Sequence, residues 1–253
     1  MTRCRPACGS AAPPISSSGA VPAAAAEAAA RGFAELGLAG VVLAGGAPDG
    51  ADWGIARGWA DLDRAEPLRP GHRFPAYGVT RLITAAAVLR LAAEGRVRLD
   101  EPASWPHDDP DAVTGYELEP DGTFVPDLDD VATMPAAAGL WTTAADLVTF
   151  GTRWSSLLPD ALAGEALRPH AAEETCPGQA GLGWRLNTAR GFAFQVGVGP
   201  GGSSFLIIKP VGRAYVAPTN RKVNVAPLER QGLPAELLGP PRPAGAVCYA
   251  DCF

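Results

Sequence analysis

The sequence predicts an α+β fold, with a mostly antiparallel sheet flanked by helices. Two observations lead to this prediction. Short apolar runs typical of strands cluster near both ends of the chain, and helix-forming stretches lie between them. The chain also has 253 residues, 47% of them hydrophobic, which is enough for one sizeable core. We therefore expect the early strands to complete a sheet built mainly from the late ones.

The first part of the chain is predicted to form a helix, a hairpin and a second helix. Residues 21–37 have high helix propensity. Residues 38–46 are an apolar run that ends in glycines, and residues 52–63 follow as its hairpin partner. A second helix follows Gly78 and stops at Gly95. Its apolar positions recur at helical spacing: Leu82, Ala86, Leu89 and Leu91.

The second part is predicted to form a helix, several strands and a closing helix. Residues 142–158 begin with a threonine suited to an N-cap and continue with an apolar face. Residues 226–239 resemble a closing helix, partly broken by Pro234. The late strands are expected at residues 181–186, 191–198, 203–210 and 213–220.

Composition suggests the boundaries of one domain. Residues 1–19 read as a disordered tail, and residues 20–239 as the folded domain. Within that domain, residues 100–135 show no periodicity, are acidic, and contain no Lys or Arg. Residues 240–253 form a Pro-rich, Cys-containing tail that we expect to be unstructured.

Charge and hydropathy exclude some classes of partner. The net charge of −6 makes nonspecific nucleic-acid binding improbable. No apolar stretch reaches 18 residues, and the N-terminus has no apolar core of a secretory signal. We therefore expect a cytoplasmic protein that binds neither nucleic acid nor membrane.

The five cysteines lie mostly in the two tails. Four of them form C-x-x-x-C pairs that could join the tails through a zinc ion, but Pro-, Ala- and Gly-rich tails favour an unstructured state. The odd number suits a reducing compartment. The prediction is therefore no metal and no cofactor. The cysteines are Cys4, Cys8, Cys176, Cys248 and Cys252.

The stretch "FPAYGVTRLITAAAVLRLAAEG" raises a chemical question. Gly78 lies where the chain enters the helix, and Arg81 follows three residues later, on the face that Gly78 is expected to share. That spacing can place a nucleophile beside its base. Glycine, however, has no side chain to acylate, and arginine stays protonated in proteins.

Several stretches together resemble the serine β-lactamase and penicillin-binding-protein-like family, specifically its class C β-lactamase and esterase branch. They are this helix, "RGWADLDRAEPLRPGHRF", "MPAAAGLWTTAADLVTFG", "GLGWRL", "FQVGVGPGGSSFLIIKP" and "YVAPTN". The resemblance covers separated blocks within residues of roughly 35–230, in a degenerate and internally shortened form. It implies a β-lactamase/transpeptidase-like fold.

The resemblance also implies three motifs, and this chain departs from each. Gly78 and Arg81 stand where S-x-x-K supplies a nucleophilic serine and a lysine base. The Y-x-N motif of the helical lobe has no match between Arg98 and Thr143, so most of that lobe is expected to be missing. Gln195 and Gly197 match the third motif, K-T-G or H-x-G, with glutamine replacing histidine.

These departures predict a β-lactamase-like pseudoenzyme, a binding module for a small acyl or peptide-like ligand. Loss of the lobe would uncover a face of the helix 79–94, which predicts self-association or a partner that fills the gap. One alternative is a hydrolase of the same family with an unrecognised nucleophile; another is a decayed gene product. The hydroxyls considered are Tyr77, Thr80, Ser203 and Ser204, and none has a titratable base near it in sequence. The histidines His72, His107 and His170 fall in predicted loops and form no evident dyad.

Overall fold

The computed structural model describes residues 12–96, 116–126, 135–172, 179–188, 191–209 and 212–222. Its helices are α1 (Ala23–Leu36), α2 (Thr80–Ala93), α3 (Pro135–Ala138), α4 (Ala144–Arg153) and α5 (Asp160–Ala166), with 3₁₀ turns η1 (Tyr77–Val79) and η3 (Trp154–Leu157). Its strands are β1 (Ile15–Gly19), β2 (Gly40–Ala47), β3 (Gly50–Asp61), β4 (Glu66–Pro67), β5 (Arg73–Pro75), β6 (Tyr116–Leu118), β7 (Phe124–Pro126), β8 (Trp141–Thr143), β9 (Ala171–Ala172), β10 (Gln179–Ala180), β11 (Arg185–Asn187), β12 (Phe192–Gly199), β13 (Gly202–Lys209) and β14 (Arg213–Val216).

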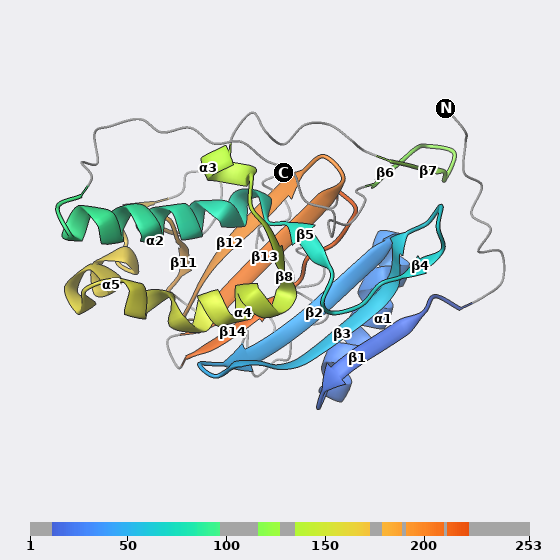
Figure 1. Cartoon of the computed structure of the whole chain (residues 1–253), viewed down its shortest axis with the longest axis horizontal. Coiled ribbons are helices and arrows are strands. Elements are labelled where there is room, and N and C mark those ends of the chain that lie inside the picture. Colours follow the sequence, from blue (N-terminus) through green and yellow to red (C-terminus); the bar gives the residue numbers. More distant parts are fainter. Residues whose placement is uncertain are drawn as a thin grey trace.

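One antiparallel sheet carries most of the strands, in the order β1-β3-β2-β14-β13-β12-β11-β10-β9 (Figure 1). The early hairpin β2–β3 joins the late strands through β14, where Ala214 lies opposite Gly46 and Val216 opposite Ala44. The predicted α+β fold and the predicted union of early and late strands are therefore confirmed.

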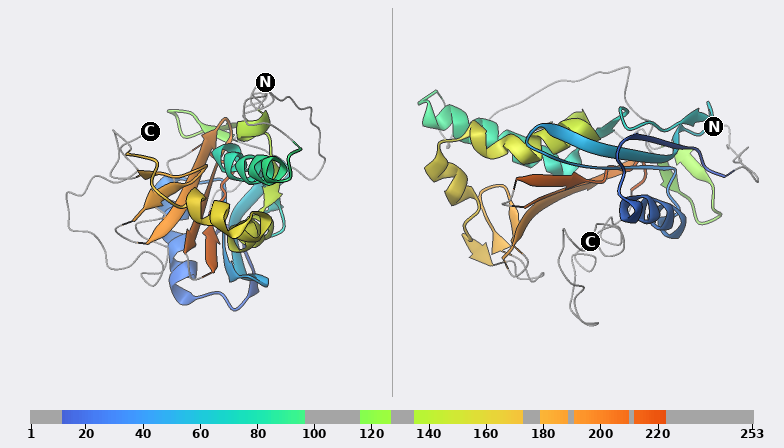
Figure 2. Two further views of the ribbon diagram at one scale, coloured as in Figure 1. Left: turned by 90° about the vertical axis from the view of Figure 1, so that its left-hand side faces the viewer. Right: turned by 90° about the horizontal axis from the view of Figure 1, so that it is seen from below.

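Helices cover both faces of the sheet (Figure 2). On one face α1 packs its small buried residues Ala25, Ala28 and Ala29 against inward side chains that include Leu43, Ile55, Phe205 and Ile207. On the other face α2 and α4 contribute Leu82, Leu147 and Val148 to a cluster that includes Val42, Leu206, Ile208 and Val216. Neighbouring residues of each strand thus point into different cores, because side chains alternate across a sheet.

Helix α4 lies very close to the sheet, and the sequence predicts how it begins. The side chain of Thr143 accepts a hydrogen bond from the backbone N–H of Asp146 at 3.1 Å, so the predicted threonine N-cap is confirmed. A Cβ atom at Gly151 would lie 2.8 Å from side-chain atoms of Ala214 and Leu206. Only glycine leaves room for this helix–sheet contact.

Two predicted irregular segments contain strands. Residues Ile15–Gly19 lie within the predicted disordered tail 1–19, yet they form β1 and pair with β3 in regular register. Part of the irregular acidic segment 100–135 forms the β6–β7 hairpin, where Tyr116 is only 1% exposed. Strand β1 is short and has mostly polar side chains, and β6 and β7 have three residues each, so neither segment shows an alternating pattern long enough to predict a strand.

Some predictions fall on residues outside the described part of the chain. These are the closing helix 226–239, the tail 240–253, and all five cysteines. Between α2 and β8 the described residues contain only the β6–β7 hairpin and the four-residue helix α3, with no larger helical lobe among them.

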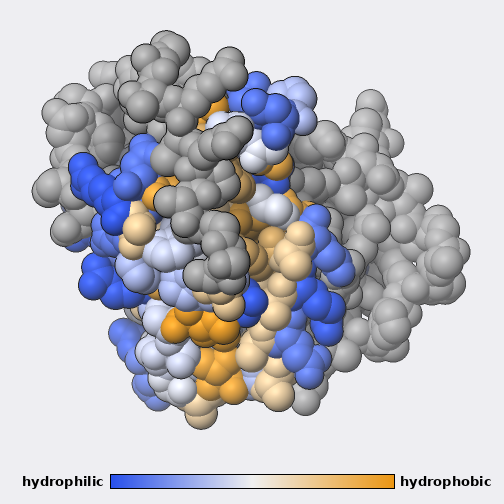
Figure 3. Space-filling view, turned by 90° about the vertical axis from the view of Figure 1, so that its right-hand side faces the viewer, coloured by the Kyte–Doolittle hydropathy of each residue, from blue (hydrophilic) through white to orange (hydrophobic). Residues whose placement is uncertain are grey.

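The described surface carries a few large apolar side chains. Ile15, Leu118, Val125 and Leu157 are the exposed ones. On the side that Figure 1 has at its right, apolar residues gather in a band between polar residues (Figure 3). In the parts of the chain that the structure describes, no helix is long and apolar enough to cross a membrane.

Candidate functional site

Gly78, which matches the serine position of the first motif, lies in a short turn, η1, between β5 and α2, and Arg81 lies in the first turn of α2. The backbone N–H of Ala76 donates to the Leu140 carbonyl at 2.8 Å, and the N–H of Val79 donates to the Ala76 carbonyl at 2.9 Å. These bonds fix the turn between β8 and the start of α2. Gly78 is buried inside this 3₁₀ turn, and α2 begins only at Thr80.

Gly78 faces the backbone of strand β12 at very close range. A Cβ atom added at Gly78 would lie under 3.0 Å from the Val196 carbonyl oxygen and 3.2 Å from the Gly197 Cα atom. Real side chains essentially never come so close to backbone, so a residue with a side chain fits only if the turn or the strand moves. The two glycines let backbone pack directly on backbone where the family motif would have a serine.

Gly197 makes the same contact from the strand side. A Cβ atom on Gly197 would lie under 3.0 Å from the Gly78 nitrogen and 2.5 Å from the Ala76 carbonyl oxygen. The structure therefore brings together two of the predicted positions, Gly78 and Gly197, in one closed contact.

Arg81 does not join that contact. It is exposed in the first turn of α2, whereas Gly78 is buried. Gly78 belongs to the 3₁₀ turn that precedes the α-helix, and the expectation that the two positions share a helix face stays a prediction. The guanidinium group thus lies at the surface and not beside the nucleophile position.

Gln195 is buried, 8% exposed, and its amide group is fully engaged. The Nε2 atom donates to the Gly183 carbonyl at 3.1 Å, and Oε1 accepts from the backbone N–H of Val196 at 3.1 Å. The strand edge that the family uses to bind substrate backbone is therefore occupied here by the chain's own groups: the Val196 N–H by Gln195, and the Val196 carbonyl by Gly78.

Tyr77 holds the turn against the β12–β13 hairpin. Its backbone has a φ of 42°, a left-handed conformation that is unusual for a non-glycine residue. A Cβ atom added at Gly199 or at Gly202 would run into the Tyr77 ring, at 3.0 Å in the case of Gly202. The ring therefore packs directly on the backbone of these two glycines. The hydroxyl donates to the Pro200 carbonyl. Tyr77 is 3% exposed, so its ring is packed between η1 and the β12–β13 hairpin. We call η1 the closed turn, because Gly78 within it lies directly against β12.

The other hydroxyls near this turn are buried. Thr80 accepts from the Leu140 N–H at 3.4 Å, and Ser203 donates to the Arg221 carbonyl at 3.3 Å. Ser204 lies opposite Gly197 in the β12–β13 ladder, is fully buried, and its Oγ atom has no hydrogen-bond partner among the described residues.

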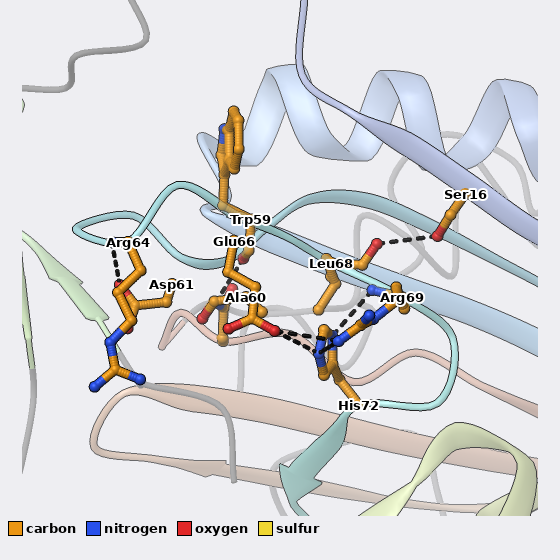
Figure 4. Close-up of polar contacts among 10 residues, drawn as sticks. Ser16, Trp59, Ala60, Asp61, Arg64, Glu66, Leu68, Arg69 and His72 are labelled. Carbon is orange, nitrogen blue, oxygen red and sulfur yellow. Dashed lines mark hydrogen bonds and ion pairs between the residues drawn. The ribbon is translucent and has the colours of Figure 1, made fainter. Parts of the chain in front are cut away.

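Sequence reasoning missed a histidine–carboxylate pair at the turn before β5 (Figure 4). The backbone N–H of Arg69 donates to His72 Nδ1 at 3.0 Å, and Nε2 lies 3.2 Å from Glu66 Oε1. The Arg69 guanidinium also reaches that carboxylate at 3.2 Å. The sequence signal for this pair is the stretch "EPLRPGH", because a turn of this length brings its first residue, Glu66, close to its last, His72. The cluster stiffens the approach to β5 and η1.

Of the two remaining predicted histidines, only His170 lies in the part of the chain that the structure describes. His170 lies 3.3 Å from Glu165 Oε1 on the far side of α5's last turn, and His107 lies outside the described residues. Among the residues that the structure describes, no three His, Cys, Asp or Glu side chains gather as a metal site.

One strongly shifted pKa lies beside the hairpin that follows α2. Burial raises the pKa of Tyr116 from 10.0 to about 12. Its hydroxyl accepts from the Leu62 N–H at 3.0 Å and lies 3.4 Å from an Asp61 carboxylate oxygen. The phenol therefore stays neutral and holds β6 to the end of β3.

The comparisons with known proteins agree with this architecture. A family model described as "Beta-lactamase" matches residues 25–115, which include β2, β3, η1 and α2. No curated protein matches the sequence.

Solved structures share the fold at low sequence identity. A penicillin-binding protein homologue from Pyrococcus abyssi, described as octameric, has a TM-score of 0.63 at 12% identity, with 76% of this chain and 71% of that one covered. A class C β-lactamase from Rhodobacter sphaeroides has a TM-score of 0.64 at 11% identity, with 81% and 96% covered. A D-stereospecific amidohydrolase from Streptomyces has a TM-score of 0.62 at 15% identity, with 85% and 99% covered.

The fold and the turn–strand contact thus define a protein of the β-lactamase/transpeptidase-like class. Residues 25–115, which include the strands and helix that carry the first motif, are similar to β-lactamases, and the described fold is similar to those of a penicillin-binding protein homologue and a class C β-lactamase. The predicted family resemblance is confirmed.

Proposed function

We propose that this protein is a pseudoenzyme of the β-lactamase fold, a binding module that does not form an acyl-enzyme. The closed contact between Gly78 and β12 carries this proposal. Gly78 offers no nucleophile, and a side chain there would run into the Val196 carbonyl. Because acyl transfer in this family needs a serine with room around it, the closed turn removes both the reacting atom and its space.

The absence of a base supports the same proposal. An arginine side chain does not act as a base in proteins, and Arg81 lies at the surface; the amide of Gln195 is not ionisable. In other serine hydrolases the loss of the nucleophile alone costs roughly a millionfold in turnover. The solved neighbours include a β-lactamase and an amidohydrolase, so the ligand class we propose is a small acyl or peptide-like molecule.

A labelling experiment tests the proposal. The purified protein is incubated with a fluorescent penicillin and with a fluorophosphonate, and its hydrolysis of nitrocefin and p-nitrophenyl esters is followed. We expect no covalent label and no turnover above the buffer rate. Stoichiometric labelling of the native chain would overturn the proposal.

A second candidate is a hydrolase with another nucleophile, and Ser204 is the residue that favours it. Its Oγ atom is unpartnered and lies opposite Gly197, beside the closed turn. If the native chain is labelled, the Ser204→Ala variant decides between the two readings. Loss of label in that variant would assign the nucleophile to Ser204.

Restoring the motif provides a matched control. The double variant Gly78→Ser with Arg81→Lys returns the two missing group types. We expect at most slow acylation, because the serine must displace the strand and position 81 is exposed. Turnover comparable to an intact family esterase would show that the closed turn is no barrier.

Two further predictions stay open to direct test. The decayed-product alternative predicts a chain without cooperative folding, so a single cooperative unfolding transition contradicts it. We also propose self-association, supported by the octameric assembly of one solved neighbour, and a cytoplasmic location.

A further inference from the structure

Strand β1 ends the large sheet and leaves one edge open. Among the described residues it is the last strand at its end of the sheet, next to β3 (Figure 1). The strand is firmly placed, because the Ser16 hydroxyl donates to the Leu68 carbonyl at 3.0 Å, as Figure 4 shows. Ile15 is 59% exposed beside this edge.

The register tells which backbone groups face outward. The N–H of Gly58 donates to the Pro14 carbonyl at 3.0 Å, so positions 14 and 58 form a hydrogen-bonded pair. Because such pairs alternate in an antiparallel ladder, Ser16 and Ser18 also bond to β3. The backbone groups of Ile15 and Ser17 therefore point away from the sheet, and so does the N–H of Gly19, whose φ of 67° takes its carbonyl out of the regular alternation.

These three outward residues are symmetric about Ser17. A second copy related by a two-fold axis at Ser17 places Ser17 opposite Ser17 and Ile15 opposite Gly19. Ser17 then exchanges two backbone hydrogen bonds with Ser17 of the other copy, and the Gly19 N–H of each copy meets the Ile15 carbonyl of the other. The exposed Ile15 side chain lies over a glycine, which has no side chain to obstruct it.

Along Ile15–Gly19 the edge has none of the charges or bulges that keep strand edges apart, and Pro13 and Pro14 precede it. Natural proteins protect an edge with charged side chains, bulges or very short strands. The segment ISSSG has no charge, and its pairing with β3 shows no bulge. At the opposite end of the sheet, β9 has only two residues.

We propose that two copies of this chain associate through β1, in antiparallel pairing about Ser17, and extend the sheet across both. The interface is isologous, as a two-fold dimer requires. It does not depend on whether the closed turn acylates. Because a single strand pair buries little surface, we expect weak, reversible association that increases with protein concentration.

Sedimentation analysis from about 5 to about 200 µM tests the proposal. We expect a reversible monomer–dimer equilibrium for the native chain. Ser17→Asp places two carboxylates opposite each other across the axis, and like charges in that position oppose pairing, so this variant should remain monomeric. Ser17→Thr keeps a neutral, strand-forming residue and should still dimerise. A native chain that stays monomeric throughout, or a Ser17→Asp variant that dimerises unchanged, overturns the proposal.

Cross-linking tests the register independently of the charged variant. In a background with the five native cysteines changed to serine, Ser17→Cys brings two Cα atoms to about 5.5 Å across the axis, within disulfide range. Ser16→Cys is the matched control, because residue 16 faces residue 18 and its own copy lies about 7–8 Å away on the diagonal. We expect mild oxidation to cross-link only the first variant. Equal cross-linking of both, or of neither, contradicts the register.

Discussion

The two halves of the candidate site differ in what they have kept. The strand half, Gln195 and Gly197, is buried, hydrogen-bonded and in the place the family motif predicts. At the turn half, Gly78 has no side chain and Arg81 is exposed, and in the proposed function this half supplies no reacting group. The difference teaches that the strand half serves the fold as well as chemistry. Its residues join β12 to the loop at Gly183 and to the turn, and those contacts remain useful without a nucleophile.

The largest expected effect on the free energy of unfolding is that of a substitution at Gly197. In Gly197→Ala the new Cβ atom would press on backbone atoms of Gly78 and Ala76, which cannot rotate away. We expect the free energy of unfolding to fall by about 3 kcal/mol, measured by urea titration. Gly71→Ala is the control, since a Cβ there meets nothing within 4 Å, and its effect should be within about 0.5 kcal/mol. Equal effects at both positions would show that the turn and strand are not in contact.

Gln195 tests the strand half through its hydrogen bonds. Gln195→Leu leaves the Gly183 carbonyl and the Val196 N–H without their partner. The expected loss is about 1–3 kcal/mol in the free energy of unfolding, because both hydrogen bonds are part-buried. Gln179→Leu serves as the control: its side chain accepts only an exposed bond from Thr188. A Gln195 variant as stable as the control would remove the structural role of the strand half.

Sequence patterns predict the strand half well and the turn half poorly. The apolar run around Gln195 specifies β12, and the alternation of its side chains places residue 195 on the α2 side of the sheet. No local pattern reports that Gly78 and Val196 are in contact, because the two residues are far apart in the chain. Whether Arg81 is buried likewise depends on where the 3₁₀ turn becomes α-helix, and propensity does not resolve such a boundary.

The same physical limit explains the other differences. The segment ISSSG forms β1 through backbone pairing alone, and its polar side chains resemble those of a loop. His72 and Glu66 become partners only because the turn between them closes. By contrast, the N-cap of α4 depends on Thr143 and Asp146, three residues apart, and such local chemistry is visible in the sequence.

The next effect in size concerns the segment that follows α2, which was expected to be irregular. The raised pKa of Tyr116 means that the folded protein holds the phenol proton more tightly than the unfolded chain. The stability this group contributes is therefore complete below pH 10 and is lost as the pH rises toward 12. The loss is at most about 2–3 kcal/mol, from a shift of two pKa units.

Urea unfolding of the native chain and of Tyr116→Phe at pH 8, 10 and 11.5 measures this contribution. The variant should be about 1 kcal/mol less stable at pH 8, because the Leu62 N–H loses its acceptor. It should then lose less stability than the native chain between pH 10 and 11.5. If the free energy of unfolding falls equally in the two proteins between pH 10 and 11.5, then Tyr116 titrates normally and the β6–β7 hairpin is loosely held.

The smallest expected effect is at Arg81, and it separates the two halves most directly. Because the guanidinium is exposed, Arg81→Ala should change the free energy of unfolding by no more than about 0.5 kcal/mol. Arg221→Ala is the matched comparison, since that half-buried guanidinium donates to the Leu36 and Gly37 carbonyls at the end of α1. Its removal leaves those helix-end carbonyls without a cation and should cost about 1–2 kcal/mol. If Arg81→Ala were instead as damaging as Arg221→Ala, the arginine would be part of the packed turn. The turn half of the motif would then serve the fold as the strand half does.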